Sequence, residues 1–292
     1  MDAEKSEPAA AYLRRVGSRD RAKKSLGQNY LIDDALLERM AAAAVPPGGG
    51  PLLEIGPGLG TLTRELLRRL ENAAGAEAGV RFWAAELDGS KVAVLRREFG
   101  GRPLCLLNAD ARAVILSDLW GSEKGAVCGN LPYYIANPLL RHFLRQRDSL
   151  SLLTVMVQNE VAERLTALPG SRAYGVLSIA ARLYAEGEIL FRAPAAAFRP
   201  APKVTSAVVR LRPRLYPGLS LPEEELLAAA KAAFAQRRKT VLNSLAAAWG
   251  RDKESLRLLL RQAAIPAAAR AEGLTIEDFQ RLALAARDFL RE

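Results

Sequence analysis

The sequence predicts an α/β domain with a doubly wound, mostly parallel sheet, followed by a small all-helical domain. From residue 51 to about 185, short apolar segments alternate with helical periodicity. Such alternation is typical of parallel strands that are connected by helices on both faces of the sheet. Beyond the segment 212–218, which holds two prolines and a glycine, only helical patterns follow. We therefore expect a first domain over 1–213 and a second over 214–292.

The elements are expected in the following order. A helix begins at Asp33 or Asp34, either of which can be its N-cap, and ends at the Pro-Gly run 46–50. Strands are expected over 51–55, 80–87, 104–107, 126–129 and 150–157, and helices over 61–70, 90–99, 138–146, 160–168 and 174–185. No helix directly precedes 204–211, so we expect this segment to close the sheet as an antiparallel strand. The second domain should contain helices over 222–235, 239–248, 253–263 and 276–290, the last with Thr275 as N-cap.

The composition is that of a soluble globular protein with surplus positive charge. The 292 residues include 42 Lys and Arg against 32 Asp and Glu, a net charge of +10. This surplus is common in proteins that bind phosphate backbones, although a merely basic soluble protein is an alternative on charge alone. Two cysteines without a CxxC motif and a single histidine give no basis for a disulfide framework or a zinc site. No apolar run approaches the roughly 18–20 residues of a membrane span, and the N-terminus lacks a signal-peptide core, so we expect a cytoplasmic protein.

A basic arm lies near the N-terminus. It contains Arg14, Arg15, Arg19, Arg21, Lys23 and Lys24, with one acidic residue among them. A segment that contacts nucleic acid and a solvated tail both fit this charge run, and the alternatives stay open here.

A glycine turn follows the first strand of the sheet and opens the next helix. Its spacing, Gly56-x-Gly58-x-Gly60, is one residue shorter than the dinucleotide fingerprint G-x-G-x-x-G. Since that fingerprint seats a pyrophosphate at the helix N-terminus, the shorter spacing argues against NAD. It favours a nucleoside cofactor without a pyrophosphate, with a purely structural tight turn as the alternative.

Acidic residues stand where the next two strands end. Glu86 can accept hydrogen bonds from ribose hydroxyls, whereas Asp88 is the expected N-cap of the following helix. Asp110 can accept a hydrogen bond from an adenine amine. Each acid taken singly is more typical of a cap or a turn. Glycines, Glu and Asp at three successive strand ends together predict a nucleoside site at this edge of the sheet.

The segment Asn130-Leu131-Pro132-Tyr133 offers the groups needed to hold the amine of an unpaired adenine. The Asn130 side-chain oxygen and the Leu131 carbonyl can each accept one N–H, which draws the amine towards tetrahedral geometry. Pro132 restricts the backbone, and Tyr133 offers a stacking face worth about 1–3 kcal/mol. Methylation itself makes the amine acidic, so no general base is needed, and the single histidine, His142, is expected to be structural. The alternative is an Asn-Pro turn beside core tyrosines.

A nucleoside cofactor and an amino-bearing base together predict methyl transfer to nitrogen. Ordered blocks at 24–31, 53–60, 86–88, 110–111, 130–134, 158–165, 202–209 and 235–245 resemble the small-subunit (16S) rRNA adenine N6-dimethyltransferase family. The resemblance implies a Rossmann-like, S-adenosylmethionine-dependent methyltransferase domain and a helical C-terminal domain that binds rRNA. The implied reaction transfers four methyl groups to two adjacent adenosines in the 3′-terminal hairpin loop of 16S rRNA, within the 30S subunit during ribosome biogenesis.

The resemblance also assigns roles to individual residues. The implied cofactor-binding residues are Asn29, Leu31, Gly56, Gly58, Glu86, Asp110 and Asn130. The implied catalytic residues are Asn130, Leu131, Pro132, Tyr133 and Phe198, with Phe198 as a second stacking ring. The implied RNA-binding residues are Arg237, Arg238 and Lys239 at a helix start, together with Lys23 and Lys24. We expect no metal, no membrane partner and a monomer.

Two positions depart from the family pattern. Tyr30 stands where Phe is usual, and Arg199 interrupts the proline run that usually follows Phe198. Ordinary core packing is therefore a real alternative for Phe198.

Three competing functions are considered. The large-subunit (23S) rRNA methyltransferase of macrolide resistance shares most motifs, but the block 235–245 and the upstream arm favour the small-subunit interpretation. A non-catalytic ribosome assembly or transcription factor would not need the intact adenine-binding segment. An NAD-dependent dehydrogenase is disfavoured by the glycine spacing.

Overall fold

The computed structural model describes residues 7–17, 29–46, 49–73, 81–132, 135–214, 216 and 218–289. The chain divides into two structural units. One consists of Met1–Ala162 and Glu186–Pro213, and the other of Glu163–Ala185 and Arg214–Glu292. The expected boundary after residue 213 coincides with one border between the units. Residues 163–185, which we expected in the first domain, group with the second unit because helix α8 (Val176–Tyr184) packs against α9 (Glu223–Ala233).

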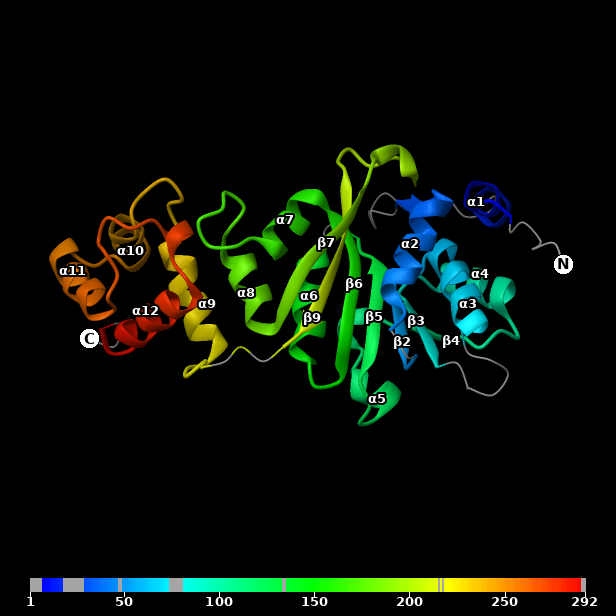
Figure 1. The fold of residues 1–292 in the computed structure, drawn as a ribbon, viewed down its shortest axis with the longest axis horizontal. Coiled ribbons are helices and arrows are strands. Elements are labelled where there is room, and N and C mark those ends of the chain that lie inside the picture. The colour runs from blue at the N-terminus through cyan, green and yellow to red at the C-terminus, as the bar shows by residue number, and fades with distance from the viewer. Residues whose placement is uncertain are drawn as a thin grey trace. The chain divides into compact units, whose positions relative to one another are not determined.

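The first unit is built on a seven-stranded sheet (Figure 1). Its strands are β2 (Leu52–Ile55), β3 (Phe82–Glu86), β4 (Cys105–Asn108), β5 (Gly125–Asn130), β6 (Leu150–Gln158), β7 (Ala185–Ala193) and β9 (Ser206–Pro213), in the spatial order β4-β3-β2-β5-β6-β9-β7. The strands from β4 to β6 pair in parallel, and β9 runs antiparallel to β6. This confirms the predicted doubly wound, mostly parallel sheet. Its strand order reverses between β2 and β5, which is where such sheets bind ligands.

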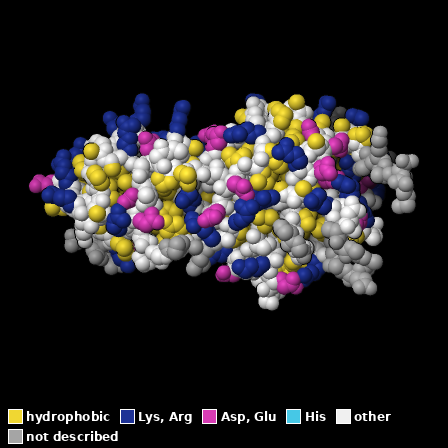
Figure 2. Space-filling view, viewed as in Figure 1, with side chains coloured by type: hydrophobic (Ala, Val, Ile, Leu, Met, Phe, Trp, Pro, Cys, Tyr) yellow, Lys and Arg dark blue, Asp and Glu magenta, His cyan; other side chains and the backbone are white. Residues whose placement is uncertain are grey.

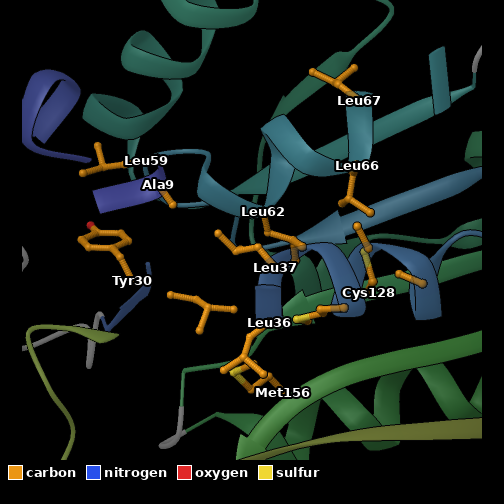
Figure 3. Close-up of a cluster of buried hydrophobic side chains, with 14 of the residues drawn as sticks. Ala9, Tyr30, Leu36, Leu37, Leu59, Leu62, Leu66, Leu67, Cys128 and Met156 are labelled. Carbon is orange, nitrogen blue, oxygen red and sulfur yellow. The ribbon is translucent and has the colours of Figure 1, made fainter. Parts of the chain in front are cut away.

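Helices pack on both faces of this sheet. On one face, α2 (Asp34–Ala44) packs against α3 (Thr61–Ala73), β5 and β6. Figure 3 shows the core between them, with Leu37 of α2 and Leu62 and Leu66 of α3 near Cys128 of β5. The other face is covered by α6 (Ala136–Arg145), which packs against β6. Side chains alternate along a strand, so cover on both faces gives the central strands β2, β5 and β6 their near-continuous burial.

The cap predictions on this unit are confirmed. Asp33 caps α2 by accepting a hydrogen bond from Leu36 N at 3.0 Å. Asp88 caps α4 (Gly89–Phe99) by accepting from Ser90 N at 3.1 Å. Both carboxylates satisfy backbone donors that a helix start leaves free.

The antiparallel strand predicted over 204–211 exists as β9, but it does not close the sheet. Strand β7 lies outside it at the edge, and the sequence analysis did not anticipate this strand. Residues 186–192 are exposed or half-buried, and their only apolar run is the three-residue segment 189–191. A strand at a sheet edge lacks the burial that makes central strands recognisable.

Two further helices and two short strands were not predicted. Helix α1 (Ala9–Gly17) forms part of the expected basic arm, β1 (Tyr30–Leu31) pairs with β8 (Phe198–Arg199) in a separate two-stranded sheet, and α5 (Leu116–Trp120) precedes β5. The pairing of β1 with β8 places the N-terminal motif beside the segment around Phe198.

The second unit is helical, as predicted. Its C-terminal helices are α9, α10 (Val241–Trp249), α11 (Lys253–Gln262) and α12 (Ile276–Phe289), and α9 packs against both α10 and α12. Phe234 stacks on Phe279 and meets Tyr174 edge-on in its core. Thr275 caps α12 by accepting from Asp278 N at 3.2 Å, which confirms the prediction. No helix among the described residues has the length and apolar character of a membrane span.

Candidate active site

All three glycines of the glycine turn have a left-handed backbone conformation. Gly56, Gly58 and Gly60 have φ angles of 63°, 59° and 90°, a region that side chains make costly. A Cβ on Gly58 would lie 2.7 Å from Cε1 of Tyr30. A Cβ on Gly56, which lines the pocket described below, would meet no protein atom within 4 Å. Gly58 therefore permits close packing against Tyr30, and Gly56 keeps backbone accessible beside the pocket.

Glu86 ties the end of β3 to this turn. Its Oε2 accepts a hydrogen bond from Gly58 N at 3.0 Å, and its Oε1 accepts one from Asp88 N at 2.9 Å. Burial raises the pKa of Glu86, and these two N–H donors oppose that shift. Each carboxylate oxygen has capacity for a second donor, so the arrangement is compatible with ribose hydroxyls.

Glu54 is an acidic residue of the site that the sequence analysis missed. It is 1% exposed near the end of β2, lines the pocket, and accepts a hydrogen bond from Thr63 Oγ1 at 2.7 Å. Its pKa is raised to about 8, because burial and the nearby Glu86 raise it by more than the Thr63 bond lowers it. An acid inside an otherwise apolar strand was the available signal, because charged residues are almost never fully buried without a reason.

Asp110 begins the third strand-end loop and is held by its neighbour. It caps the short 3₁₀ helix η3 (Ala111–Ala113) through Arg112 N at 2.9 Å, and its Oδ2 lies 2.6 Å from Nη2 of Arg112. These contacts with Arg112 lower the pKa of Asp110, so it is ionised at neutral pH.

Asn130 ends β5 and is oriented by the N-terminal motif. Its Nδ2 donates to the carbonyl oxygen of Asn29 at 2.9 Å, which leaves Oδ1 as the acceptor end of the amide. Leu131 follows, and its N–H donates to Met156 O at 3.0 Å, which anchors this peptide on β6. On the other side of β5, Gly129 allows close approach to β2, since a Cβ there would lie 2.4 Å from Ile55 O.

One pocket joins these groups. Its wall includes all of the following predicted site residues: Asn29, Leu31, Gly56, Gly58, Glu86, Asp110, Asn130, Leu131 and Pro132. Glu86 and Asp110 give the wall two acidic groups besides the buried Glu54, whose raised pKa keeps it largely protonated, and no Lys, Arg or His occurs among the described residues that line it. Such a wall is unsuited to a pyrophosphate and suited to a ligand that carries positive charge.

Other predicted residues are placed differently. Tyr133, Lys23 and Lys24 lie outside the described residues. Phe198 is 1% exposed in the hydrophobic core cluster and does not line the pocket, so stacking on a base would require its ring to leave the core. His142 has the expected structural role, with Nε2 lying 2.8 Å from Val114 O.

The predicted RNA-binding residues of the second unit are exposed. Lys and Arg side chains project from the surface of this unit in Figure 2, and Arg237, Arg238 and Lys239 are all exposed. They lie in the turn before α10 and not in its first turn, because Thr240 is the N-cap. Arg237 also donates to the carbonyl oxygen of Arg172.

A model of the family "Ribosomal RNA adenine dimethylase" matches residues 19–288. The chain belongs to this family. It is 50% identical over 275 residues to the ribosomal RNA small subunit methyltransferase A of Desulfitobacterium hafniense, a match that covers 94% of this chain and 96% of the relative. The corresponding protein of Geobacillus thermodenitrificans is 39% identical over 228 residues, covering 76% and 75% of the two chains.

Solved structures of methyltransferases share the fold. The 23S rRNA methyltransferase ErmE aligns with a TM-score of 0.62 and 25% identity, over 88% of this chain and 98% of its own. A dimethyladenosine transferase from Plasmodium falciparum aligns with a TM-score of 0.66 and 23% identity, over 86% and 94%. The predicted Rossmann-like methyltransferase fold is thereby confirmed.

As a member of the rRNA adenine dimethylase family, the chain is an adenine dimethyltransferase that uses S-adenosylmethionine. The pocket fits this cofactor, since its wall carries carboxyl groups for a cationic ligand and a glycine turn for close backbone approach. The dehydrogenase alternative is excluded by the family assignment.

Proposed function

We propose that this protein dimethylates N6 of two adjacent adenosines in the 3′-terminal hairpin loop of 16S rRNA, within the 30S subunit during ribosome biogenesis. The observation that carries the proposal is the shared pocket of the glycine turn and Asn130. The similarity to small-subunit methyltransferases supports the 16S target over the 23S target, because it reaches 50% identity as against 25% for ErmE.

We assign the cofactor to the three strand ends. Glu86 would accept hydrogen bonds from the ribose hydroxyls, and Asp110 would accept one from the adenine amine. Gly56 and Gly58 would let the cofactor lie close to the backbone. Asn29, Leu31 and Asn130 would complete the wall on the side of the target base. S-adenosylmethionine supplies an electrophilic methyl group on a sulfonium centre.

The chain's own task is to shape and aim the target amine. Oδ1 of Asn130 and the Leu131 carbonyl accept its two N–H groups, and the Asn29 carbonyl fixes which end of the Asn130 amide faces the amine. Two acceptors draw the nitrogen lone pair out of conjugation with the ring. Holding the two reacting atoms in line can supply several kcal/mol of rate acceleration by positioning alone.

The target adenosine must leave its stack to reach the pocket, so an unpaired loop adenosine is the least costly substrate. We assign base stacking to Tyr133 from the sequence motif, and give Phe198 a packing role because of its burial. We assign phosphate contacts to Arg237, Arg238 and Lys239, whose side chains are exposed, and to the arm that contains Lys23 and Lys24.

We further propose that the protein acts as a monomer, without a metal, in the cytoplasm where small subunits are assembled. The cofactor is already electrophilic, so the reaction needs no Lewis acid. The 30S subunit provides the rRNA, and the residues assigned to the cofactor all lie in one chain, which supports a monomer.

Labelled methyl transfer tests the proposal. Under-methylated 30S and 50S subunits are incubated separately with the protein and methyl-labelled S-adenosylmethionine, and the rRNA is digested to nucleosides. We expect label in N6,N6-dimethyladenosine from 30S subunits, and its loss in Asn130→Ala. Label in 50S subunits alone would transfer the assignment to the 23S class, and binding to 30S without any transfer would favour an assembly factor.

A further inference from the structure

Helix α1 lies outside the part of the chain that the family model matches, yet it packs beside the cofactor turn. The match begins at residue 19, whereas α1 spans Ala9–Gly17. Its buried residues Ala9, Tyr12 and Val16 have the spacing of a single helix face, and α1 packs against α3. A helix of nine residues is marginal on its own, so its order depends on this packing.

Tyr12 connects α1 to the glycine turn. Its hydroxyl donates to the carbonyl oxygen of Leu59 at 2.9 Å, and the residue is 2% exposed. Leu59 lies between Gly58 and Gly60 in the turn. The Leu59 side chain is also covered, since a Cβ on Gly17 would lie 3.3 Å from its Cδ1. Helix α1 therefore contacts both the backbone and the side chain of one turn residue.

Two guanidinium groups contact the Tyr12 ring. The Arg15 and Arg64 Cζ atoms lie 5.3 and 4.9 Å from its centroid, in cation–π geometry. Burial raises the pKa of Tyr12, so the hydroxyl keeps its proton and stays a donor. The ring position, and with it the direction of the hydroxyl, is thus fixed independently of Leu59.

The helix is fastened to three elements of the sheet domain. Ala9 N donates to Oδ1 of Asp34 in α2 at 2.9 Å, and Nη1 of Arg64 in α3 donates to Glu7 O at 2.6 Å. Nη1 of Arg15 donates to Oε2 of Glu98 in α4 at 2.8 Å. These bonds hold α1 in place against the sheet domain, so the position of the Tyr12 hydroxyl is restrained.

A turn with three glycines has the most backbone freedom to lose when it becomes ordered. Inside the sheet it is restrained by the bonds from Gly56 N to Ala85 O at 2.9 Å and from Gly58 N to Glu86. The Tyr12 bond restrains the opposite end of the turn, next to Gly60. The N–H end of the same Leu59–Gly60 peptide donates to Pro57 O at 2.9 Å. Without the Tyr12 bond, this peptide keeps only that restraint, and cofactor binding must supply more of the free energy that orders it.

We propose that Tyr12 is a positioning residue of the cofactor site, which acts through the Leu59 carbonyl to hold the glycine turn in its binding conformation. This inference rests on the proposed function only in taking S-adenosylmethionine as the ligand of the turn. It assigns a role in cofactor binding to a helix that precedes the family match.

The test is the cofactor affinity of Tyr12→Phe, measured by calorimetry on the full-length protein without RNA. We expect the Kd for S-adenosylmethionine to rise about three- to tenfold, the equivalent of one net hydrogen bond. At saturating cofactor and rRNA, kcat should stay within twofold of wild type, because Tyr12 does not touch the reacting atoms. A Kd within twofold of wild type would overturn the proposal, as would an equal loss of kcat.

Leu211→Val serves as the stability control. Leu211 is fully buried in β9, and its truncation lowers global stability without contact to the turn. We expect its Kd to be unchanged at an equal loss of thermal stability, and an equally raised Kd would show a general structural effect and overturn the proposal. Failure of the proposed function can be told apart from failure of this inference. If the wild-type protein bound the cofactor but methylated another RNA, the cofactor affinities of wild type and Tyr12→Phe could still be compared.

Discussion

The side-chain amide of Asn130 is held in one orientation by the backbone of Asn29, through a hydrogen bond of 2.9 Å from Nδ2 to the carbonyl oxygen. The two residues lie 101 positions apart in the sequence and belong to different motifs. The N-terminal motif thus determines which end of the Asn130 amide is available as an acceptor for the target amine.

Replacing Asn130 by Asp tests this relationship. The carboxylate keeps two acceptor oxygens and nearly the same shape, but one oxygen would face the Asn29 carbonyl without a donor between them. We expect the methyl-transfer rate at saturating cofactor to fall by about 100-fold or more, as for the loss of one aligned polar group in other active sites. Single-turnover assays on under-methylated 30S subunits measure it. A rate close to that of wild type would mean that the donor end of the amide is not needed.

A methyl group at Gly58 should damage the turn sterically. In Gly58→Ala the Cβ would meet the Tyr30 ring at 2.7 Å, in addition to the cost of a positive φ of 59°. We expect unfolding free energy to fall by about 1–3 kcal/mol and cofactor affinity to fall at least tenfold. Urea denaturation and calorimetry measure the two effects.

Gly101→Ala is the matched control for Gly58→Ala. Gly101 has a φ of 83°, but a Cβ there would meet nothing within 4 Å. Gly101→Ala should lose only the unfolding free energy that a side chain at positive φ costs, and it should bind the cofactor with wild-type affinity. If both variants lost cofactor affinity equally, contact with Tyr30 would not be the cause.

The buried Glu54 should make stability depend on pH. Burial raises its folded-state pKa to about 8 from 4.5, so between these values the folded chain keeps a proton that the unfolded chain releases. Unfolding free energy should therefore fall as pH rises from about 4.5 to 8, by an amount on the order of a few kcal/mol. In Glu54→Gln this contribution is absent, and the difference between the two proteins in urea denaturation isolates it. Parallel stability curves from pH 5 to 8 would show that Glu54 is not protonated in the folded state.

Tyr174→Phe should not destabilise the helical unit. The residue is 1% exposed, and its hydroxyl has no hydrogen-bond partner within the described part of the chain. Removing a buried, unpaired hydroxyl should leave unfolding free energy unchanged or raise it by up to about 1 kcal/mol. Tyr184→Phe is the comparison, because the Tyr184 hydroxyl donates to Glu223 and its loss should cost about 1 kcal/mol. A clear loss of stability in Tyr174→Phe would point to a buried water on that hydroxyl.

The exposed basic turn of the second unit should determine part of the salt dependence of subunit binding. Replacing Arg237, Arg238 and Lys239 by Ala should lower the slope of log K against log salt by roughly 0.7 for each phosphate that the variant no longer neutralises. Cofactor affinity should not change. The triple variant at Lys253, Arg257 and Arg261 on α11 removes the same charge, and an equal slope change there would indicate a general charge effect.

The sequence was sufficient to predict the parallel sheet and most of the pocket wall, because both leave local patterns. Central strands are apolar, and strand ends carry glycine, Glu and Asp at recognisable spacing. The edge strand β7 and helix α1 were missed for the opposite reason, since their order comes from packing and not from their own composition. The contact between Asn130 and Asn29 could not be predicted, because a backbone carbonyl is present at every residue and only the fold selects one.

The division of the chain was harder to predict than its elements. The segment Glu163–Ala185 follows the alternating pattern of the sheet domain in sequence but packs with the C-terminal helices. The burial of Phe198 could likewise not be predicted, because it depends on tertiary contacts. An exposed and a buried aromatic residue look alike in a loop sequence.

The central claim is that the cofactor and the target amine meet in the pocket between the glycine turn and Asn130. A crystal structure with S-adenosylhomocysteine bound tests it most directly. We predict ribose hydroxyls on Glu86, the adenine beside Asp110, and the sulfur on the Asn130 side, with room for a methyl group within roughly 3–4 Å of the amine position. A ligand bound elsewhere, or an Asn130 amide turned away from the sulfur, would contradict the account.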